Sequence, residues 1–183
     1  MSSWIVLAVA VLIAAWAVFA FNRLVRLRNQ MRSAWADIDV QLTRRHDLVP
    51  QLVNAVQAYA SHERAVLTAV TELRAKALRE TSPARLAEVE SALEQGLSRI
   101  FALKEAYPDL DASENFLELQ RELVDVEEHL QYARRFYNGA VRDYNDTVQR
   151  VPDMLVARLF AFDGGEFYQA RAEERAAVEV QLS

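Results

Sequence analysis

Several residue types that carry chemistry are absent from this sequence or scarce in it. None of the 183 residues is cysteine, which excludes disulfides, thiolate metal ligands and a cysteine nucleophile. Only four glycines and four prolines are present, so the chain has few places to turn. Alanine, leucine, glutamate and arginine dominate instead, and these residues favour helices. The composition predicts an all-helical protein with short connections.

The three histidines are not spaced as metal ligands usually are. Carboxylate-bridged metal sites in helical bundles use a glutamate three residues before a histidine. None of His46, His62 and His129 has such a glutamate. A zinc protease requires a second histidine three residues after a His-Glu pair, and the pair formed by His62 and Glu63 is not followed by one. The sequence therefore gives no support for a metal site.

No set of residues in the sequence matches a known catalytic motif. The chain has no Gly-x-Ser-x-Gly elbow and no glycine-rich phosphate loop. Asp37 and Asp39 diverge on a helix because they are two residues apart, so we expect surface charges. Glu127, Glu128 and His129 lie between apolar helix positions, and we expect them on a solvated face. We predict that the protein is not an enzyme and holds no cofactor.

A long apolar run lies near the start of the chain. Residues 4–21 are 18 consecutive apolar residues, which as a helix span about 27 Å and just cross a bilayer. Four arginines follow, here called the arginine collar: Arg23, Arg26, Arg28 and Arg32. Because basic residues mark cytoplasmic flanks, we expect a single-pass anchor with a short N-terminus outside and the body in the cytoplasm. The alternative is a cleaved signal peptide, which usually has a cationic start and a shorter apolar core.

Charge is unevenly distributed along the chain. The net charge is −5, but residues 22–50 hold six arginines against three aspartates, so this stretch carries +3 and the remainder −8. Nucleic-acid binding needs a basic stripe, and the acidic body lacks one. We expect membrane lipids beside the collar and no nucleic-acid partner.

Residues 34–56, AWADIDVQLTRRHDLVPQLVNAV, join the anchor to the body. Their apolar residues recur every three or four positions, which predicts a helix with one buried seam: Trp35, Ile38, Leu42, Val49, Leu52 and Val56. Arg45 occupies a seam position, where an unpaired charge would be costly. It must therefore pair with an acidic side chain or carbonyls of another helix, or mark a recognition point for a partner protein or another subunit.

The breaker residues divide the chain into three long helices. We predict a helix over residues 22–80, kinked at Pro50 or, less favourably, stopped there. A second is predicted over 83–106 after a Ser82 cap, and a third from about Asp111 or Ser113 to about 151. Short turns make them an antiparallel up-and-down bundle. We expect residues 154–162 to form a short capping helix. The chain then divides into three parts: an anchor (1–21), a bundle (22–168) and a charged tail (169–183), which we expect to be a frayed helix or disordered.

A Tyr-Asn pair occurs twice, seven residues apart, as Tyr137-Asn138 and Tyr144-Asn145. Both tyrosines should therefore line one helix face and both asparagines a neighbouring face. We interpret the repeat as a polar ladder beside the apolar seam that fixes helix register. Ligand binding is the alternative.

The predicted helix lengths favour self-association. As rods rising about 1.5 Å per residue, the helix from 31 to 80 is about 75 Å long and that from 83 to 106 about 36 Å. The shorter helix cannot cover the longer one, which leaves a row of apolar residues without a partner in their own chain: Met31, Trp35, Ile38, Leu42, Val49 and Leu52. Either neighbouring copies cover these residues as a coiled coil, or the first helix folds back at Pro50 or near Ser61.

The chain resembles the LemA family of bacterial membrane proteins over nearly its whole length. The resemblance rests on the anchor, AWADIDVQLTRRHDLVPQLV, YNGAVRDYN, and then VP and FAF. Val151 stands where a Phe commonly precedes the Pro, and Ala161 where a Gly commonly separates the two Phe. The resemblance implies a single N-terminal transmembrane helix, a helical bundle and no established activity. The residues that we assign to the family motif or to a contact surface are Trp35, Asp37, Asp39, Arg44, Arg45, His46, Asp47, Pro50, Tyr137, Asn138, Tyr144, Asn145, Pro152, Phe160 and Phe162.

Two functions follow from these features. The favoured one is a scaffold in the bacterial cytoplasmic membrane that acts through self-association and through contacts with other membrane proteins. The alternative is a module that binds a small ligand or lipid within its bundle. The apolar seams disfavour the alternative because they are filled with leucine, valine, isoleucine and tyrosine, whereas a ligand site needs a cavity with convergent polar groups.

Overall fold

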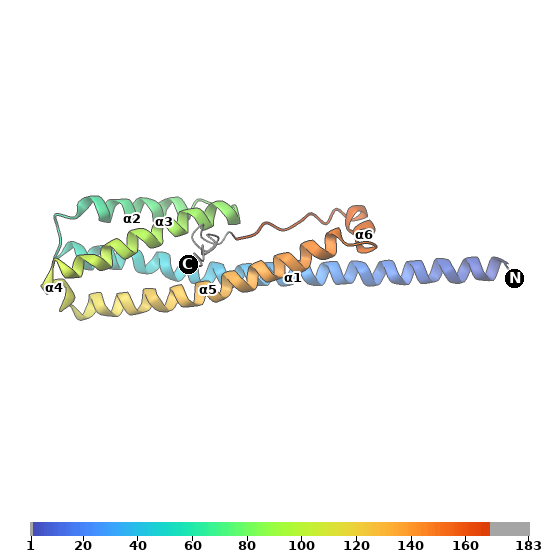
Figure 1. Cartoon of the computed structure of the whole chain (residues 1–183), viewed down its shortest axis with the longest axis horizontal. Coiled ribbons are helices and arrows are strands. Elements are labelled where there is room, and N and C mark those ends of the chain that lie inside the picture. Colours follow the sequence, from blue (N-terminus) through green and yellow to red (C-terminus); the bar gives the residue numbers. More distant parts are fainter. Residues whose placement is uncertain (1, 169–183) are drawn as a thin grey trace, which may run out of the picture. The chain divides into compact units, whose positions relative to one another are not determined.

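The computed structural model describes residues 2–168, and all regular structure in that range is helical (Figure 1). The elements are α1 (Ser2–Gln57), α2 (Arg64–Ala77), α3 (Pro83–Ala102), the short 3₁₀ helix η1 (Leu103–Glu105), α4 (Pro108–Asp111), α5 (Glu114–Gln149) and α6 (Asp153–Leu159). The all-helical prediction is confirmed. The prediction for the tail, 169–183, falls outside the described residues.

Helix α1 is unbroken over 56 residues and includes Pro50 in its interior. The prediction that it continues to Glu80 is wrong, because the helix ends at Gln57. A tight turn follows, in which the Ala60 N–H donates to the Val56 carbonyl at 2.8 Å and the Glu63 N–H to the Ala60 carbonyl at 3.1 Å. The break therefore lies at the second of the two positions considered, near Ser61. Folding back here buries apolar residues of α2 that a straight rod would leave in water.

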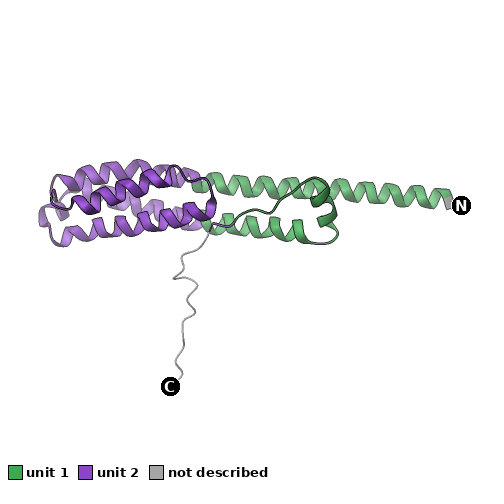
Figure 2. Ribbon diagram, turned by 90° about the horizontal axis from the view of Figure 1, so that it is seen from above, with its two compact units in different colours: residues 1–38, 133–166 green, residues 39–132, 167–183 purple. Residues whose placement is uncertain are grey.

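The chain divides into two compact units (Figure 2). Unit 1 comprises residues up to 38 and 133–166, and unit 2 comprises 39–132 with the residues from 167 onward. Helices α1 and α5 are long enough to contribute to both units. Each unit has a core of its own.

Unit 2 contains four longer helical segments, which are the second part of α1, α2, α3 and the first part of α5, together with the short η1 and α4. The start of α3 follows the prediction, because Ser82 Oγ accepts the Arg85 N–H at 3.4 Å and Pro83 is the first helical residue. Ser113 Oγ accepts the Phe116 N–H in the same way at the start of α5. The buried apolar residues of this core include Leu42, Val49, Leu52, Val56, Leu67, Val70, Leu93, Leu97, Ile100, Phe116, Leu123, Val126 and Leu130.

Gly96 lets α3 approach α2 closely within unit 2. A Cβ atom at this position would lie 2.7 Å from Val70 Cγ2, which is closer than packed carbon atoms come. The absence of a side chain at Gly96 therefore permits the close crossing of the two helices. The single helix predicted over residues 22–80 is two helices, α1 and α2, in the structure. The close crossing at Gly96 therefore joins α2 to the next long helix in the chain, α3.

Unit 1 contains the first part of α1, the last part of α5, α6 and the connection that follows α6. Its core cluster consists of Ala20, Leu24, Tyr144, Val156, Ala157 and Phe162. Helix α6 ends in a turn that bonds the Phe162 N–H to the Ala157 carbonyl at 2.9 Å and the Ala161 N–H to the Arg158 carbonyl at 3.4 Å. Ala161 has φ 52°, a left-handed conformation that glycine adopts most easily.

The expectation that a row of apolar residues on the first helix has no partner in its own chain is wrong, because the same chain covers these residues. Ile38, Leu42 and Leu52 are at most 3% exposed within the single chain. Met31 packs beside Gly165 and the Trp35 ring lies 5.2 Å from that of Tyr137. The chain covers these residues itself because α2 folds back and because α5 is 36 residues long.

Candidate functional site

The core of unit 2 contains a buried ionic cluster. Arg45 Nη1 donates to Glu90 Oε2 at 3.1 Å, and Arg45 Nη2 is ion-paired with Glu127. The other oxygen of Glu90, Oε1, lies 2.6 Å from His46 Nε2. The side chains of Arg45 and Glu90 are 2% and 0% exposed. We call Arg45, His46, Glu90 and Glu127 the ionic cluster.

The cluster joins helices of unit 2 through side chains and backbone. Arg45 and His46 are consecutive on α1, whereas Glu90 lies on α3 and Glu127 on α5. Helix α2 is included because Arg74 Nε donates to the carbonyl of His46 at 2.6 Å. At the surface beside the cluster, Arg44 Nη1 donates to Asp125 Oδ2 at 2.7 Å. These polar contacts depend on position along each helix, so they fix the register of four helical segments.

The structure confirms that Arg45 is partnered, and its partners are acidic side chains of other helices. The expectation that Glu127 lies on a solvated face is wrong, because its side chain is only 20% exposed and pairs with Arg45. Glu90 was missed altogether. A signal for it exists: Leu86, Glu90, Leu93, Leu97 and Ile100 are spaced four, three, four and three residues apart, so a glutamate occupies a seam of α3 just as Arg45 occupies one of α1.

The other charged residues of the motif on α1 face outward. Asp37, Asp39, Arg44 and Asp47 are exposed, and Pro50 is half-buried. Asp37 and Asp39 are surface charges, as the sequence predicts. The motif thus has an inner face that closes the core and an outer face available to solvent.

The ionic cluster is arranged for structure rather than for reaction. Both oxygens of Glu90 already accept from Arg45 and His46, which leaves no free carboxylate oxygen for a substrate. Within residues 2–168, no group of three or more His, Cys, Asp or Glu side chains is placed to hold a metal ion. The geometry of the ionic cluster supports a structural role, which is to hold α1, α2, α3 and α5 in one register.

In unit 1 the Tyr-Asn repeat holds the connection after α6. Tyr137 Oη donates to the Glu166 carbonyl at 2.7 Å. The Asn145 amide makes two bonds with Gly165, accepting its N–H at 2.7 Å and donating to its carbonyl at 3.0 Å. We call these three bonds the clasp. The clasp fastens an extended segment, so the interpretation of these groups as a helix-register ladder is wrong for Tyr137 and Asn145.

Both tyrosines of the repeat lie on the buried face of α5, as predicted, and Asn138 is partly buried. Burial raises the pKa of Tyr137, with a further contribution from the charge of Glu166. Burial also raises the pKa of Tyr144, and Asp163 adds to this, whereas Arg28 and Arg32 act in the opposite direction. Both tyrosines therefore remain neutral at physiological pH.

The arginine collar divides into two pairs. Arg23 forms a salt bridge with Asp153 at 3.1 Å, and Arg28 lies over the ring of Phe162 at 4.8 Å. Arg26 and Arg32 are exposed. Two collar residues thus support unit 1, and two remain available to solvent or to a membrane surface.

The last motif residues, Pro152, Phe160 and Phe162, lie at the two ends of α6. Phe162 is buried in the unit 1 core, whereas Pro152 and Phe160 are exposed. The rings of Phe160 and Phe162 lie 4.9 Å and 5.6 Å from the ring of Phe21. The FAF motif therefore packs beside the last residue of the apolar run.

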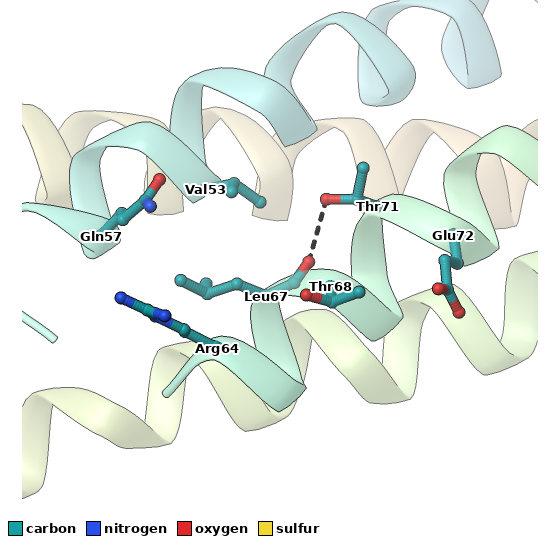
Figure 3. Close-up of a pocket in the computed structure, with 7 residues that line it drawn as sticks. All are labelled: Val53, Gln57, Arg64, Leu67, Thr68, Thr71 and Glu72. Atoms are coloured by element: carbon teal, nitrogen blue, oxygen red, sulfur yellow. Dashed lines mark hydrogen bonds between the residues drawn. The ribbon is translucent and has the colours of Figure 1, made fainter. Parts of the chain in front are cut away.

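A groove opens between α1 and α2 in unit 2 (Figure 3). Its volume is about 310 Å³. Figure 3 shows Val53 and Gln57 of α1 on one side and residues of α2 on the other. Its lining is Val53, Gln57, Arg64, Leu67, Thr68, Thr71 and Glu72. Sequence reasoning did not find this groove, because it exists only where α2 folds back on α1.

Comparison with known proteins gives a consistent set of relatives. Protein LemA of Metamycoplasma hominis is 25% identical over 162 residues, which cover 86% of this chain and 73% of that protein. Magnetosome protein MamQ 2 of Paramagnetospirillum magneticum is 20% identical over 180 residues, and Magnetosome protein MamQ of Magnetospirillum gryphiswaldense is 18% identical over 177. The matches cover 65% of each magnetosome protein, so this chain spans slightly less than two thirds of their length.

A match to a protein family covers most of the chain. Residues 34–182 match the LemA family. That range includes the motif on α1, the three acidic partners of Arg44 and Arg45, the Tyr-Asn repeat and α6. The chain therefore belongs to the LemA family.

Proposed function

We propose that this protein is a membrane-anchored scaffold that acts through self-association and protein contacts at the bacterial cytoplasmic membrane. The observation that carries the proposal is the continuity of α1, which passes from the apolar run into the cores of both units without a break. Such a helix joins the apolar run directly to folded structure, with no flexible linker between the two.

Exposure of the apolar run supports its role as the anchor. Helix α1 is the one helix among the described residues that is long and apolar enough to cross a membrane. Trp4 is 77% exposed and Leu12 is 68% exposed. The core helix of a water-soluble protein would bury such residues against its own chain. A lipid environment accounts for their exposure.

The arginine collar supports an orientation with the body in the cytoplasm. Reporter fusions to the C-terminus of the full chain test this orientation. We expect fluorescence from a reporter that folds only in the cytoplasm and no activity from alkaline phosphatase, which needs an oxidising compartment. The opposite pattern would reverse the orientation and leave the anchor in place.

A row on α5 in unit 2 supports protein contacts. Val124, Glu128 and Tyr132 are four residues apart and all exposed, so they form one ridge on the helix. Val124 is 50% exposed and Tyr132 is 69% exposed. An exposed tyrosine beside an aliphatic residue and a charge is typical of a contact surface.

The scaffold proposal is tested by measuring the mass of the full-length protein in mild detergent by light scattering. We expect an oligomer, and we expect Val124→Glu with Tyr132→Glu to shift it to monomer. Ala69→Glu with Ala75→Glu is the matched control, because it adds the same charge at two exposed positions of α2. A monomer at all concentrations would end the self-association part of the proposal.

The groove favours a second candidate function, the binding of a small polar ligand. Its volume is at the lower end of the range for ligand sites, roughly 300 to 1,000 Å³, and it combines Arg64 and Thr68 with the apolar Val53 and Leu67. Thermal-shift screening with nucleotides, metal ions and lipids tests it. Stabilisation that is lost in Arg64→Ala would favour binding at the groove, whereas no stabilisation by any compound would leave the scaffold as the sole candidate.

A further inference from the structure

Helix α6 has two apolar faces, only one of which is covered. Val156 and Ala157 are buried in the unit 1 core, at 4% and 1% exposed. Leu155 and Leu159 lie one turn apart on the other side and are 60% and 78% exposed. Val151 and Phe160, which flank the helix, are 68% and 53% exposed. We call Val151, Leu155, Leu159 and Phe160 the α6 patch.

The patch lies beside the end of the apolar run. The unit 1 core joins Val156 and Ala157 to Ala20 and Leu24, and Trp16, Ala17 and Phe21 pack against the same cluster. The ring of Phe160, a member of the patch, lies 4.9 Å from that of Phe21. Helix α6 is therefore packed against the last turns of the segment that we propose to cross the membrane.

The contacts of α6 lie at the level along α1 where a helix in the membrane surface would lie. From Trp16 to Phe21, α1 rises about 7.5 Å along its axis, at about 1.5 Å per residue. Helices that lie in a membrane surface bury their apolar faces about 5 to 10 Å into the boundary between headgroups and acyl chains. An element packed against residues 16–24 of a membrane-spanning helix therefore sits at that boundary.

The charges around the patch suit anionic lipid headgroups. Arg150 and Arg158 are exposed at the two ends of α6, and Arg26 is exposed on α1. The salt bridge between Arg23 and Asp153 fixes the start of α6 to α1 at the level of the collar. Apolar side chains between exposed arginines are the pattern of an element that lies in a membrane surface.

We propose that the α6 patch inserts into the headgroup boundary of the same bilayer that α1 spans, with Arg150 and Arg158 at the level of the phosphates. This inference rests on the proposed membrane anchor. It gives α6 a function beyond closing the unit 1 core: it sets the depth of α1 and restricts rotation about its axis, because a second element must remain in the membrane surface. A second copy of the chain is the other occupant that could cover the patch.

The absence of cysteine allows a direct test with single-cysteine variants of the full chain. Leu159→Cys and Leu155→Cys place an environment-sensitive fluorophore on the patch. Leu12→Cys reports the anchor, and Glu88→Cys, at an exposed position of α3 in unit 2, is the water-exposed control. Each variant is reconstituted into vesicles of phosphatidylcholine and phosphatidylglycerol, without brominated lipids or with lipids brominated near the top of the acyl chain for the patch and near its end for position 12, and is also titrated with iodide.

We expect the brominated lipids to quench the emission at positions 155 and 159 several-fold more strongly than at position 88, with iodide showing the reverse order. Iodide quenching without lipid quenching at 155 and 159, while position 12 remains lipid-quenched, would overturn the inference and leave the anchor intact. Protection from both quenchers, together with disulfide crosslinking between two Leu159→Cys chains, would assign the patch to a second copy. Loss of lipid quenching at position 12 would overturn both the anchor and the inference.

Discussion

The two units of this protein stabilise their cores by different means. In unit 2, four helical segments surround an ionic cluster in which Arg45 and Glu90 are almost completely buried. In unit 1, two helical segments and α6 close over aliphatic and aromatic side chains, and the clasp ties the following segment by side chain to backbone bonds. We infer that helices whose apolar seams can pack in more than one register need polar contacts to select one register. The short segment after α6 is held instead by hydrogen bonds from side chains to its backbone.

The largest expected effect comes from breaking the ionic cluster. Arg45→Leu leaves Glu90 buried beside His46 without its guanidinium partner, so we expect a loss of about 3 to 5 kcal/mol in the free energy of unfolding. Arg44→Leu is the matched control. It breaks the surface pair with Asp125, in which both side chains are more than 40% exposed, and should cost about 0 to 1 kcal/mol. Denaturant unfolding of the two variants measures the difference.

The same cluster offers a reciprocal test. Replacing both Arg45 and Glu90 with leucine removes the two most deeply buried charges together, and well-packed apolar residues at such sites are often neutral or stabilising. We expect the double variant to recover most of the stability lost in Arg45→Leu. Equal losses in the single and double variants would show that the cluster's packing, and not its charge pairing, stabilises unit 2.

In unit 1 the comparable change is Asn145→Ala, which removes both bonds to Gly165. At about 0.5 to 1.5 kcal/mol for each bond, we expect a loss of about 1 to 3 kcal/mol. Amide exchange of Gly165 should accelerate at the same time. Asn54→Ala, at an exposed position of α1 in unit 2, should change neither quantity appreciably, and an unaltered Gly165 exchange rate in Asn145→Ala would contradict the clasp.

A smaller effect in unit 1 concerns the end of α6. Ala161 has φ 52°, a conformation that costs a residue with a Cβ about 1 kcal/mol. Ala161→Gly should therefore raise the free energy of unfolding by up to that amount. Ala112 ends α4 at φ −80°, so Ala112→Gly should instead lower stability by about 0.5 to 1 kcal/mol. Similar effects of the two changes would indicate that Ala161 is not strained.

The smallest expected effect compares two helical glycines, one from each unit. A Cβ at Gly139 in α5 would meet no atom within 4 Å, so Gly139→Ala should stabilise by about 0.5 to 1 kcal/mol. Gly96→Ala should lose this gain, because its Cβ would lie 2.7 Å from Val70 Cγ2. Thermal unfolding of both variants tests the close contact of α2 and α3, and equal gains would show that α2 moves away freely.

Local signals in the sequence predict much of the fold. The period of apolar residues identifies the buried face of α1 from Trp35 to Val56, and Ser82 with Pro83 marks the start of α3. Arg45 could be predicted to have a partner because a seam position imposes burial. Each of these inferences depends on residues within a few turns of one another, which is the range over which helix propensity and capping act.

The misses depend on contacts between distant residues. The end of α1 at Gln57 has no proline or glycine beside it, and the fold-back is favoured by burial of Leu67 and Val70 in unit 2. Glu90 has a local signal in the apolar seam of α3, but its partner Arg45 is 45 residues away, and the burial of Glu127 depends on the same Arg45, 82 residues away. The partner of Asn145 is the backbone of Gly165. A backbone partner cannot be recognised from the sequence, because every residue has a backbone carbonyl.

The central claim is that α1 couples the membrane to the body as one unbroken helix. Hydrogen–deuterium exchange of the full-length protein in lipid nanodiscs tests it most directly. The account predicts slow exchange throughout residues 22–57, including both sides of Pro50, and fast exchange in the turn at 58–63. Fast exchange within residues 22–37 would contradict it, because the apolar run would then be a tether attached by a flexible hinge.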